Sequence, residues 1–254
     1  MKIISWNVNG IRAVQKKGFL DWFREESPDI LCLQETKAHP DQLDMELLAV
    51  PGYQVYWSWS EVKKGYSGVA TYTKSKPSKV ARGFGKPKFD QEGRILLTEY
   101  PAFILLNIYF PNGKSGPERL QYKLDFYEET LKFTHRLRKE GQEVVVCGDY
   151  NTAHQPIDLA RPKENEDVSG FLPVERAWMD RWVVSGQVDI FRKFHPEPER
   201  YTWWDMKSGA RARNVGWRID YHFVSAKLAG KARDAYHLPE VIGSDHCPVV
   251  VDLA

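Results

Sequence analysis

Residues 144–151 read VVVCGDYN, a short apolar run that ends in a carboxylate and an amide. Its β-branched residues favour a strand, and a run that is apolar on both sides of the alternation fits a strand covered on both faces. Three other runs end in the same way, with ISW before NVNG, LCLQ before Glu35 and LNIYF before PNG. Loops just past strand ends are where α/β enzymes place their chemistry. These runs therefore predict an α/β fold whose chemistry lies at strand ends.

Outward from these runs, short β-branched segments alternate with helical patterns, which is typical of an α/β protein. We expect strands at residues 2–6, 30–34, 68–73, 95–99, 103–109, 143–148, 219–224 and 249–253. We expect helices at residues 18–26, 117–140 and 173–185, because apolar residues recur there at helical spacing and Gly or Pro marks an end. In the second helix, the stripe expected to face the core is Leu120, Leu124, Tyr127, Leu131 and Thr134. No linker or repeat divides the chain, so we expect one domain over residues 1–254.

Composition restricts the class of protein. The chain has 36 Lys and Arg against 34 Asp and Glu, so its net charge of +2 identifies no partner. Three cysteines without paired spacing indicate buried thiols in a reducing compartment, not a disulfide framework. The N-terminus meets polar residues too soon for a signal peptide, and no apolar run approaches the roughly 18 residues of a bilayer span. We therefore expect a soluble intracellular protein, cytoplasmic and, in a prokaryote, associated with the nucleoid.

Carboxylates and amides beside apolar runs indicate a metal site. The residues concerned are Asn7, Glu35, Asp149, Asn151, Asp220 and Asp245. Taken singly, each is a common turn residue. Together they supply hard oxygen ligands, which suit Mg²⁺ or Mn²⁺ and not Zn²⁺. No Cys/His cluster has zinc spacing, and no HExxH motif is present.

His246 directly follows Asp245 in GSDHCPV. An imidazole oriented by a carboxylate can be held in its charged form, and a charged imidazole would neutralise a phosphate oxygen as negative charge builds in a transition state. A serine hydrolase is disfavoured because no GxSxG motif occurs. A nucleotide-binding enzyme is disfavoured because the chain has no GxxxxGK[ST] loop and no GxGxxG after a strand.

Basic residues gather in two stretches that also carry aromatic residues. The first has no acidic residue between Val62 and Phe89 and contains Lys63, Lys64, Lys74, Lys76, Lys79, Arg82, Lys86 and Lys88, interleaved with Tyr66, Tyr72 and Phe84. The second, YTWWDMKSGARARNVGWR, contains Trp203, Trp204, Lys207, Arg211, Arg213, Trp217 and Arg218. Cations meet phosphates, and exposed aromatic rings stack on bases or line a pocket for a displaced nucleotide. A solvated basic face with core tryptophans is the alternative for each stretch.

Ten motifs in order along essentially the whole chain point to one family: ISWNVNGIRA, LCLQETK, GYSGVATYT, EGRI, NIYFPNG, GDYNTAH, SGFLPVER, YTWW, NVGWRIDY and GSDHCPV. The chain resembles the exonuclease III and apurinic/apyrimidinic endonuclease family. This resemblance implies a four-layer α/β sandwich of two packed mixed β-sheets flanked by helices, as in DNase I-like enzymes. It also implies Mg²⁺ as the cofactor, with Mn²⁺ as an alternative ion, and a monomer is our default expectation. Such an enzyme cleaves double-stranded DNA 5′ to abasic sites to leave a 3′-hydroxyl, and has 3′→5′ exonuclease and 3′-end-cleaning activity.

The matching motifs imply roles for individual residues. The implied metal ligands are Asn7, Glu35, Asp149, Asn151 and Asp245. The implied catalytic residues are Tyr109 near the phosphate, Asp149 activating the water, Asn151 positioning it, and Asp220 orienting His246. The implied DNA contacts are Asn9, Arg12, Tyr66, Arg94 and Asn112, with Trp203 and Trp217 as walls of a pocket for a flipped abasic sugar. Whether Asp149 acts as the base or binds the metal stays open.

Two alternatives compete with this interpretation. Inositol polyphosphate 5-phosphatases and sphingomyelinases share the strand-end groups, but the basic and aromatic stretches and WRIDY favour nucleic acid. A catalytically silent DNA-binding module needs cations but no acidic cluster, so the acidic set argues against it. One departure from the family pattern is Val168, where some relatives carry Asn, which puts the hydrogen bonding there in doubt.

Overall fold

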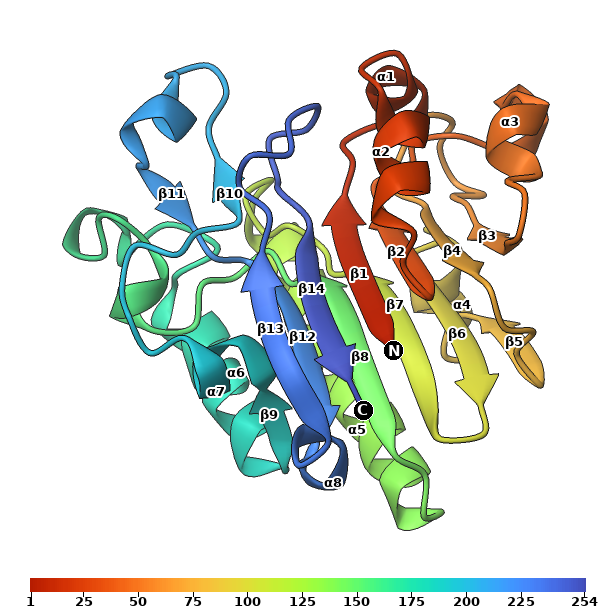
Figure 1. Ribbon diagram of the computed structural model, residues 1–254. Helices are drawn as coiled ribbons and strands as arrows, with labels where there is room; N and C mark the ends of the chain where they lie inside the picture. The colour runs from red at the N-terminus through yellow and green to blue at the C-terminus, as the bar shows by residue number, and fades with distance from the viewer.

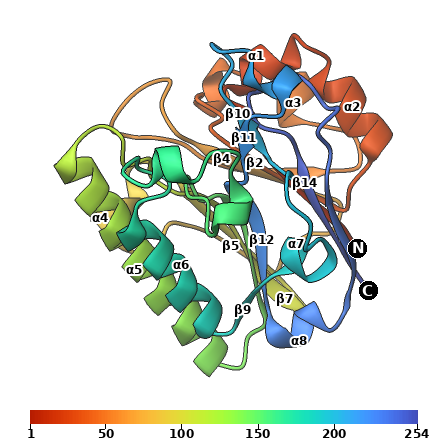
Figure 2. The same cartoon turned by 90° about the vertical axis from the view of Figure 1, so that its left-hand side faces the viewer.

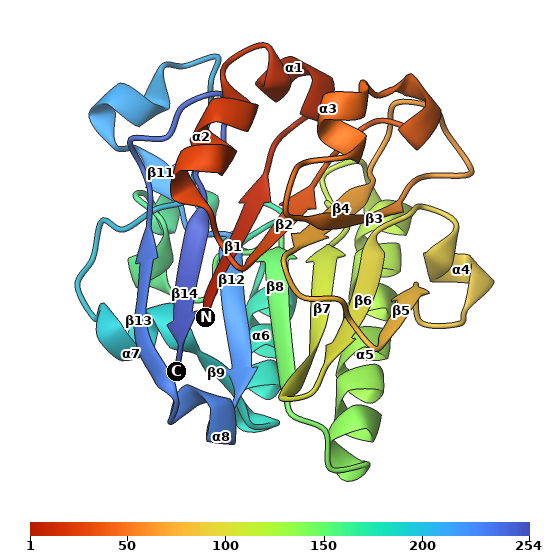
Figure 3. The ribbon, with the colours of Figure 1, turned by 45° about the vertical axis from the view of Figure 1, so that its right-hand side comes forward.

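Two six-stranded mixed sheets pack face to face in the computed structural model, which describes residues 1–254 (Figures 1 and 3). The first sheet has the order β13 (Ala232–His237), β14 (Val249–Leu253), β1 (Lys2–Asn7), β2 (Ile30–Gln34), β4 (Val69–Thr73), β3 (Gln54–Ser58). The second has the order β5 (Lys79–Arg82), β6 (Ile95–Tyr100), β7 (Phe103–Tyr109), β8 (Val144–Asp149), β12 (Asp220–Ser225), β9 (Gln187–Asp189). A separate two-stranded ribbon joins β10 (Trp203–Trp204) to β11 (Gly216–Trp217).

Helices cover the outer faces of both sheets. The first sheet is covered by α1 (Ile11–Gln15), α2 (Phe19–Glu26) and α3 (Met45–Leu48), through a buried cluster that includes Trp6 and Phe23. The second is covered by α4 (Pro87–Asp90), α5 (Pro117–Lys139) and α6 (Pro173–Val184), through Phe126 and Trp178. Figure 2 shows these two groups of helices on opposite sides of the molecule. The predicted four-layer α/β sandwich is therefore confirmed. No helix combines the length and apolar character that a membrane crossing requires.

The space between the sheets is filled mainly by aliphatic side chains and thiols. Ile3, Leu105 and Val251 belong to this core, and so do Cys32 and Cys147. Two short helices, α7 (Ile190–Phe194) and α8 (Ala226–Ala229), contribute to its edge. All three cysteines of the chain are buried and free, which confirms the prediction of buried thiols. The remaining elements are short 3₁₀ turns: η1 (Pro40–Gln42), η2 (Pro156–Asp158), η3 (Lys163–Asn165) and η4 (Ala210–Arg213).

The eight predicted strands and three predicted helices are all present, with ends shifted by no more than one residue. The sequence did not predict β3, β5, β9 or β13, all four of which lie at sheet edges. β5 is the clearest case, because its sequence KVAR is largely exposed and carries no apolar alternation. An edge strand needs only backbone pairing to one neighbour, so its side chains leave a weak pattern.

The stripe expected on α5 was only partly confirmed, because Tyr127 and Thr134 are buried but the three leucines are not. The side chains buried from this helix include Lys123, Phe126, Thr130, Phe133 and Leu137. The expected Leu120, Leu124 and Leu131 are only half-buried. The true stripe keeps the same helical spacing. It was missed in part because Lys123 and Thr130 interrupt its apolar character.

The topology brings the polar strand ends to one edge of the sandwich. β1 and β2 are parallel, and so are β7 and β8, so the carboxyl ends of each pair lie together. β12 runs antiparallel to β8 with Asp220 opposite Asp149. β14 runs antiparallel to β1, which places the turn before β14 beside Asn7. Residues from both sheets can therefore meet in a single site.

Candidate active site

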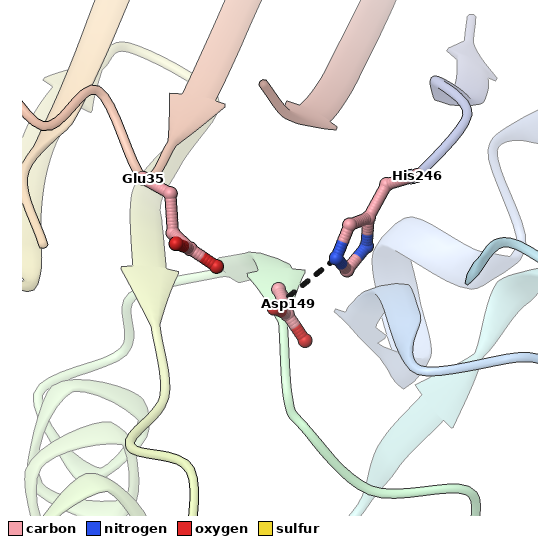
Figure 4. A group of neighbouring side chains, drawn as sticks. All are labelled: Glu35, Asp149 and His246. Atoms are coloured by element: carbon pink, nitrogen blue, oxygen red, sulfur yellow. Dashed lines mark ion pairs between the residues drawn. The ribbon is translucent and has the colours of Figure 1, made fainter. Parts of the chain in front are cut away.

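Three ionisable side chains from distant parts of the chain converge at this edge (Figure 4). Glu35 follows β2, Asp149 ends β8, and His246 precedes β14. One ligand atom from each lies within 4.8 Å of the others. Glu35 and His246 come from the first sheet and Asp149 from the second, so packing of the two sheets creates the site.

Asn7 connects the two carboxylates. This buried residue donates from Nδ2 to Glu35 Oε1 and to Asp149 Oδ2, both at 2.9 Å. Its Oδ1 accepts from the backbone N–H of Asn9 at 3.0 Å. As its hydrogen bonds orient it, the amide therefore presents nitrogen, and not oxygen, to the carboxylates.

Glu35 is ionised despite its partial burial. Burial opposes the charge, but the Lys37 ammonium at 2.8 Å and the Asn7 amide outweigh it and lower the pKa of the Glu35 carboxyl. Lys37, which also contacts Asn9, was not among the predicted site residues. The LQETK motif contained the signal, because Lys37 lies two residues after the carboxylate.

The pKa of Asp149, in contrast to that of Glu35, is raised. Burial raises the pKa of its carboxyl to about 7, with His246 opposing the rise and the charges of Asp220 and Glu35 adding to it. A carboxylate whose pKa lies near the working pH is suited to accept a proton from water. Its Oδ2 lies 3.9 Å from His246 Nε2.

His246 is held as an imidazolium. Its Nδ1 lies 2.8 Å from Asp220 Oδ2, and that oxygen also accepts from Thr202 Oγ1 at 2.6 Å. Burial alone would lower the pKa of His246, but the carboxylates of Asp220 and Asp149 raise it to about 10. The arrangement places a charged N–H donor at the site. Thr202, in the YTWW motif, was not predicted as part of this chain of bonds.

Asn151 closes the opposite side of the site. Its backbone N–H donates to Asp149 Oδ1 at 2.7 Å, and its Nδ2 donates to Phe110 O at 2.9 Å. Its Oδ1 accepts from Asn112 Nδ2 at 2.9 Å. Asn151 has a φ of 51°, in the left-handed region that residues with a Cβ seldom adopt. Glu35 has a φ of 50°, so two of the converging loops are strained, as is common at functional sites.

Tyr109, at the end of β7, lies against this cluster. Burial raises the pKa of its phenol well above the ordinary value, and the Glu35 charge adds to that rise. The phenol therefore stays protonated at neutral pH and can donate a hydrogen bond. The Arg94 guanidinium carbon lies 4.6 Å from the centre of its ring.

A cavity of about 200 Å³ opens onto these groups. Trp203 and Trp217 meet edge to face, with ring centres 6.3 Å apart, and both line it. The Lys114 ammonium lies 5.5 Å from the centre of the Trp203 ring. Gly170 forms part of the wall, where a Cβ would come within 3.2 Å of Trp217. Lys114 and Gly170 were not predicted. Lys114 follows the NIYFPNG motif directly, whereas Gly170 lies inside SGFLPVER.

The predicted DNA contacts occupy different environments. Arg12 is exposed on α1, and Asn112 lines the cavity. Asn9 donates to Asp245 Oδ1 at 2.9 Å. Arg94 is only 1% exposed and donates to Tyr109 O and to the Tyr66 hydroxyl. This placement differs from the expected backbone contact, because a buried guanidinium holding two tyrosines has no open face for DNA.

The two basic stretches do not each form one continuous face. Lys63 and Lys64 are exposed beside Tyr66, which Arg94 connects to Tyr109 of the site. Lys74 bonds to Ser27 and lies past the end of β4 that is remote from the site.

In the second stretch, Arg218 is fully buried between Asp158 and Asp189. Arg211 donates to backbone carbonyls of the 239–244 segment. The sequence grouped these cations by position along the chain, whereas several of them stabilise the fold.

The donor set fits a hard divalent cation. Glu35 and Asp149 offer carboxylate oxygens at close range, the ligand type of Mg²⁺ and Mn²⁺. Ligands must be deprotonated, so His246 in its charged form is not one of them. Asp245 lies outside the converging group, because its carboxylate accepts from Asn9 and from Trp203 Nε1. The Asn151 amide oxygen is likewise taken up by Asn112.

Comparison with known proteins gives concordant results. The endonuclease/exonuclease/phosphatase family model matches residues 4–246. An exodeoxyribonuclease of Bacillus subtilis (strain 168) is 45% identical over 251 residues, which is 98% of this chain and 98% of that protein. A DNA-(apurinic or apyrimidinic site) endonuclease of Dictyostelium discoideum is 40% identical over 258 residues, covering 100% of this chain and 71% of that protein. The solved structure of a 3′ phosphatase from Neisseria bound to a product DNA hairpin has a TM-score of 0.92 at 29% identity, covering 100% of this chain and 99% of that chain.

Proposed function

The chain belongs to the endonuclease/exonuclease/phosphatase family, within its exonuclease III and AP endonuclease branch, and from this premise we propose that it hydrolyses the DNA phosphodiester 5′ to abasic sites. Members of this family are metal-dependent phosphodiesterases, and the proposed product end is a 3′-hydroxyl. The observation that carries the proposal is the convergence of Glu35, Asp149 and His246 beside an aromatic cavity.

Asp149 is the proposed general base. Its raised pKa lets it accept the proton of an attacking water near neutral pH. Asn151 is bonded to Asp149 through both its backbone and its amide, so it lies where it can orient that water and the scissile phosphate. Such alignment matters because phosphodiesters hydrolyse very slowly without an oriented nucleophile.

Charge that builds on the phosphate is met by donors on the chain. The His246 imidazolium, oriented by Asp220, would donate to a phosphate oxygen. Tyr109, which remains protonated, and Asn112 are further donors beside the same cavity. Tyr109 and Asn112 keep their protons in the ground state, so these two residues act by stabilising the negative charge on the phosphate.

The proposed cofactor is Mg²⁺, with Mn²⁺ as an alternative. Glu35 and Asp149 would hold it, with Asn7 bonded to both. When bound, a divalent ion supplies Lewis-acid stabilisation of phosphate oxygens. Asp149 is thus a candidate for two roles, base and ligand. Asp245 and Asn151 stay further candidates for the ligand role.

The aromatic cavity supports the abasic substrate class. Trp203 and Trp217 enclose a space that suits a flipped sugar without a base. We propose that Arg12, Asn9 and Tyr66 lie along the DNA backbone path, with Arg94 supporting Tyr66. Exonuclease and 3′-end-cleaning activities belong to the same proposal, because each ends in hydrolysis of a phosphate ester at the same catalytic groups.

A duplex with one abasic analogue, labelled at its 5′ end, tests the proposed function. With Mg²⁺ we expect a single cut 5′ to the lesion and a 3′ end that a polymerase extends; EDTA should abolish the cut. Asp149→Asn should remove nicking while leaving DNA affinity largely intact. Nicking by this variant at the parental rate would exclude Asp149 as the base. Phosphate release from an inositol polyphosphate without DNA cleavage would support the alternative substrate class, and DNA binding without any cleavage would support a silent binding module.

We further propose that the protein acts as a monomer with one domain over residues 1–254, in the cytoplasm or at the nucleoid. Sedimentation at enzyme concentrations used in the assay checks the monomer. A dimer whose dissociation abolishes cleavage would contradict it.

A further inference from the structure

A fully buried ion pair lies directly behind the active site. Lys123 on α5 and Glu175 on α6 are each 0% exposed, and Lys123 Nζ lies 2.6 Å from Glu175 Oε1. Neither residue contacts the cavity. Glu175 belongs to the SGFLPVER motif, to which the proposed chemistry gives no part. A buried pair of this kind is weak evidence for stability, because apolar residues of similar volume often stabilise a fold equally well.

The partners of Lys123 point to the site. Besides Glu175, its ammonium donates to the backbone carbonyl of Asn151 and to Thr152 Oγ1, both at 2.8 Å. All three donors of the ammonium are therefore used. Two of the three bonds fix the turn in which Asn151 adopts its left-handed backbone conformation.

The partners of Glu175 hold the wall of the cavity. Its Oε1 accepts from Ser169 Oγ at 2.9 Å, and its Oε2 accepts from the backbone N–H groups of Gly170 and Leu172 at 2.6 and 3.0 Å. Gly170 is also bonded to the Asn151 turn, because its carbonyl accepts from Ala153 N at 2.8 Å. One ion pair thus joins two helices, the turn of a proposed catalytic residue and the segment 169–172.

We propose that Lys123 and Glu175 are positioning residues for the reaction, which act by fixing the Asn151 turn and the 169–172 wall in one relative geometry. The proposal rests on the proposed function through the role given to Asn151. The hydrogen bonds from the buried Lys123 ammonium are directional, so they allow few alternative positions of the Asn151 turn. An apolar contact in the same place would allow the turn to shift. A small displacement of the group that orients the water is costly for the rate.

The test replaces the pair without leaving a lone buried charge. The double variant Lys123→Met with Glu175→Gln keeps an acceptor for the 169–172 segment but removes the bond to the Asn151 carbonyl. The matched control is Arg181→Met with Glu128→Gln, since this pair joins the same two helices at 2.6 Å and does not line the cavity. Both are made in the parental protein and in Asn151→Ala. Melting temperatures show that each variant is folded.

Single-turnover cleavage of the abasic duplex is compared across these proteins. The test variant should lose about tenfold or more in rate in the parental background, with KM changed much less. In the Asn151→Ala background it should lose less than about twofold, because residues that act through one another are not additive. The control should change the rate less than about twofold in either background.

Two results would overturn the proposal. One is a rate for the test variant equal to that of its control. The other is that the test variant reduces the cleavage rate by the same factor in the Asn151→Ala background as in the parental protein. The pair would then serve the fold alone. Failure of the proposed function looks different, because the parental enzyme itself would then leave the abasic duplex intact. The same comparison would in that case be made on a 3′-recessed duplex, where it still decides the role of the pair.

Discussion

Asp149 and Asp220 face each other across neighbouring strands, yet their surroundings give them different tasks. Asp220 is bonded through Oδ2 to His246 Nδ1 and accepts from Thr202 at the same oxygen, so it orients the imidazolium. Burial and the charges of Asp220 and Glu35 raise the pKa of Asp149 to about 7, although the other ring nitrogen of His246, 3.9 Å away, opposes the rise. One imidazole between two carboxylates therefore separates the charge stabiliser from the base.

Asp220→Asn tests this division at the scale of single residues. Without that charge, the pKa of His246 should fall from about 10, so a smaller fraction of the ring is charged at the working pH. We expect kcat to fall on the order of 100-fold, the loss typical for one preorganised charge stabiliser. Steady-state cleavage measures it, with the exposed Asp234→Asn as control. Parental kcat in Asp220→Asn would show that the charged ring does not contribute.

The loop before β4 carries two exposed cations, Lys63 and Lys64, beside Tyr66. Changing Lys63 and Lys64 to Ala should weaken DNA binding for all sequences and lower the slope of log K against log salt by up to about 0.9 for each lost phosphate contact. Lys74→Ala with Lys76→Ala is the control, because those lysines lie past the remote end of the same strand. Binding titrations at several salt concentrations measure both slopes. Equal slopes in the two variants would place Lys63 and Lys64 off the DNA path.

β12 makes the fold sensitive to acid. His222 on this strand is buried, its Nε2 has no partner, and burial lowers the pKa of the ring to about 3. In the unfolded chain the pKa of His222 is near the ordinary 6.5. Between about pH 3 and 6.5 the unfolded chain therefore binds a proton at His222 that the folded protein does not bind. The stability that comes from neutral His222 is therefore fully present above pH 6.5. As pH falls toward 3, the free energy of unfolding decreases by about 1.4 kcal/mol per pH unit.

Denaturant unfolding at pH 8 and pH 5 checks this expectation in the parental protein and in His222→Gln. The variant should lose less stability between the two pH values. The pH dependence should not vanish, because burial also lowers the pKa of His237. Identical pH dependence in both proteins would contradict the assignment to His222.

The elements also show what the sequence could and could not predict. Glu35 and Asp149 were predictable, because each interrupts an apolar run at the end of a central strand. Lys123 was not, because a lysine within a helix normally indicates an exposed position, and only its partner on α6 makes burial possible. Arg218 was misjudged for the same reason, since its two carboxylate partners come from distant segments. Such pairings depend on tertiary contacts that no local pattern records.

At the scale of the whole molecule, the site exists only while the two sheets keep one relative position. Most of their interface is aliphatic and non-directional. A buried polar group crosses it: Asn107 on β7 donates to Ala70 O at 2.8 Å and accepts from Gln34 Nε2 at 2.8 Å. Gln34 immediately precedes Glu35, so these bonds tie the first sheet to the second one residue from the proposed metal ligand. The aliphatic interface alone would allow the sheets to shift, whereas these hydrogen bonds fix their relative position at the site.

The central claim is that carboxylates from the two sheets bind one divalent cation together. Mn²⁺ binding, followed by electron paramagnetic resonance in the parental protein, Glu35→Gln and Asp149→Asn, tests it directly and does not depend on turnover. We expect the parental protein to bind Mn²⁺ at this site and each substitution alone to weaken that binding by about tenfold or more, since each removes one charged ligand. Parental affinity in either variant would contradict the account, because that carboxylate would then not hold the ion.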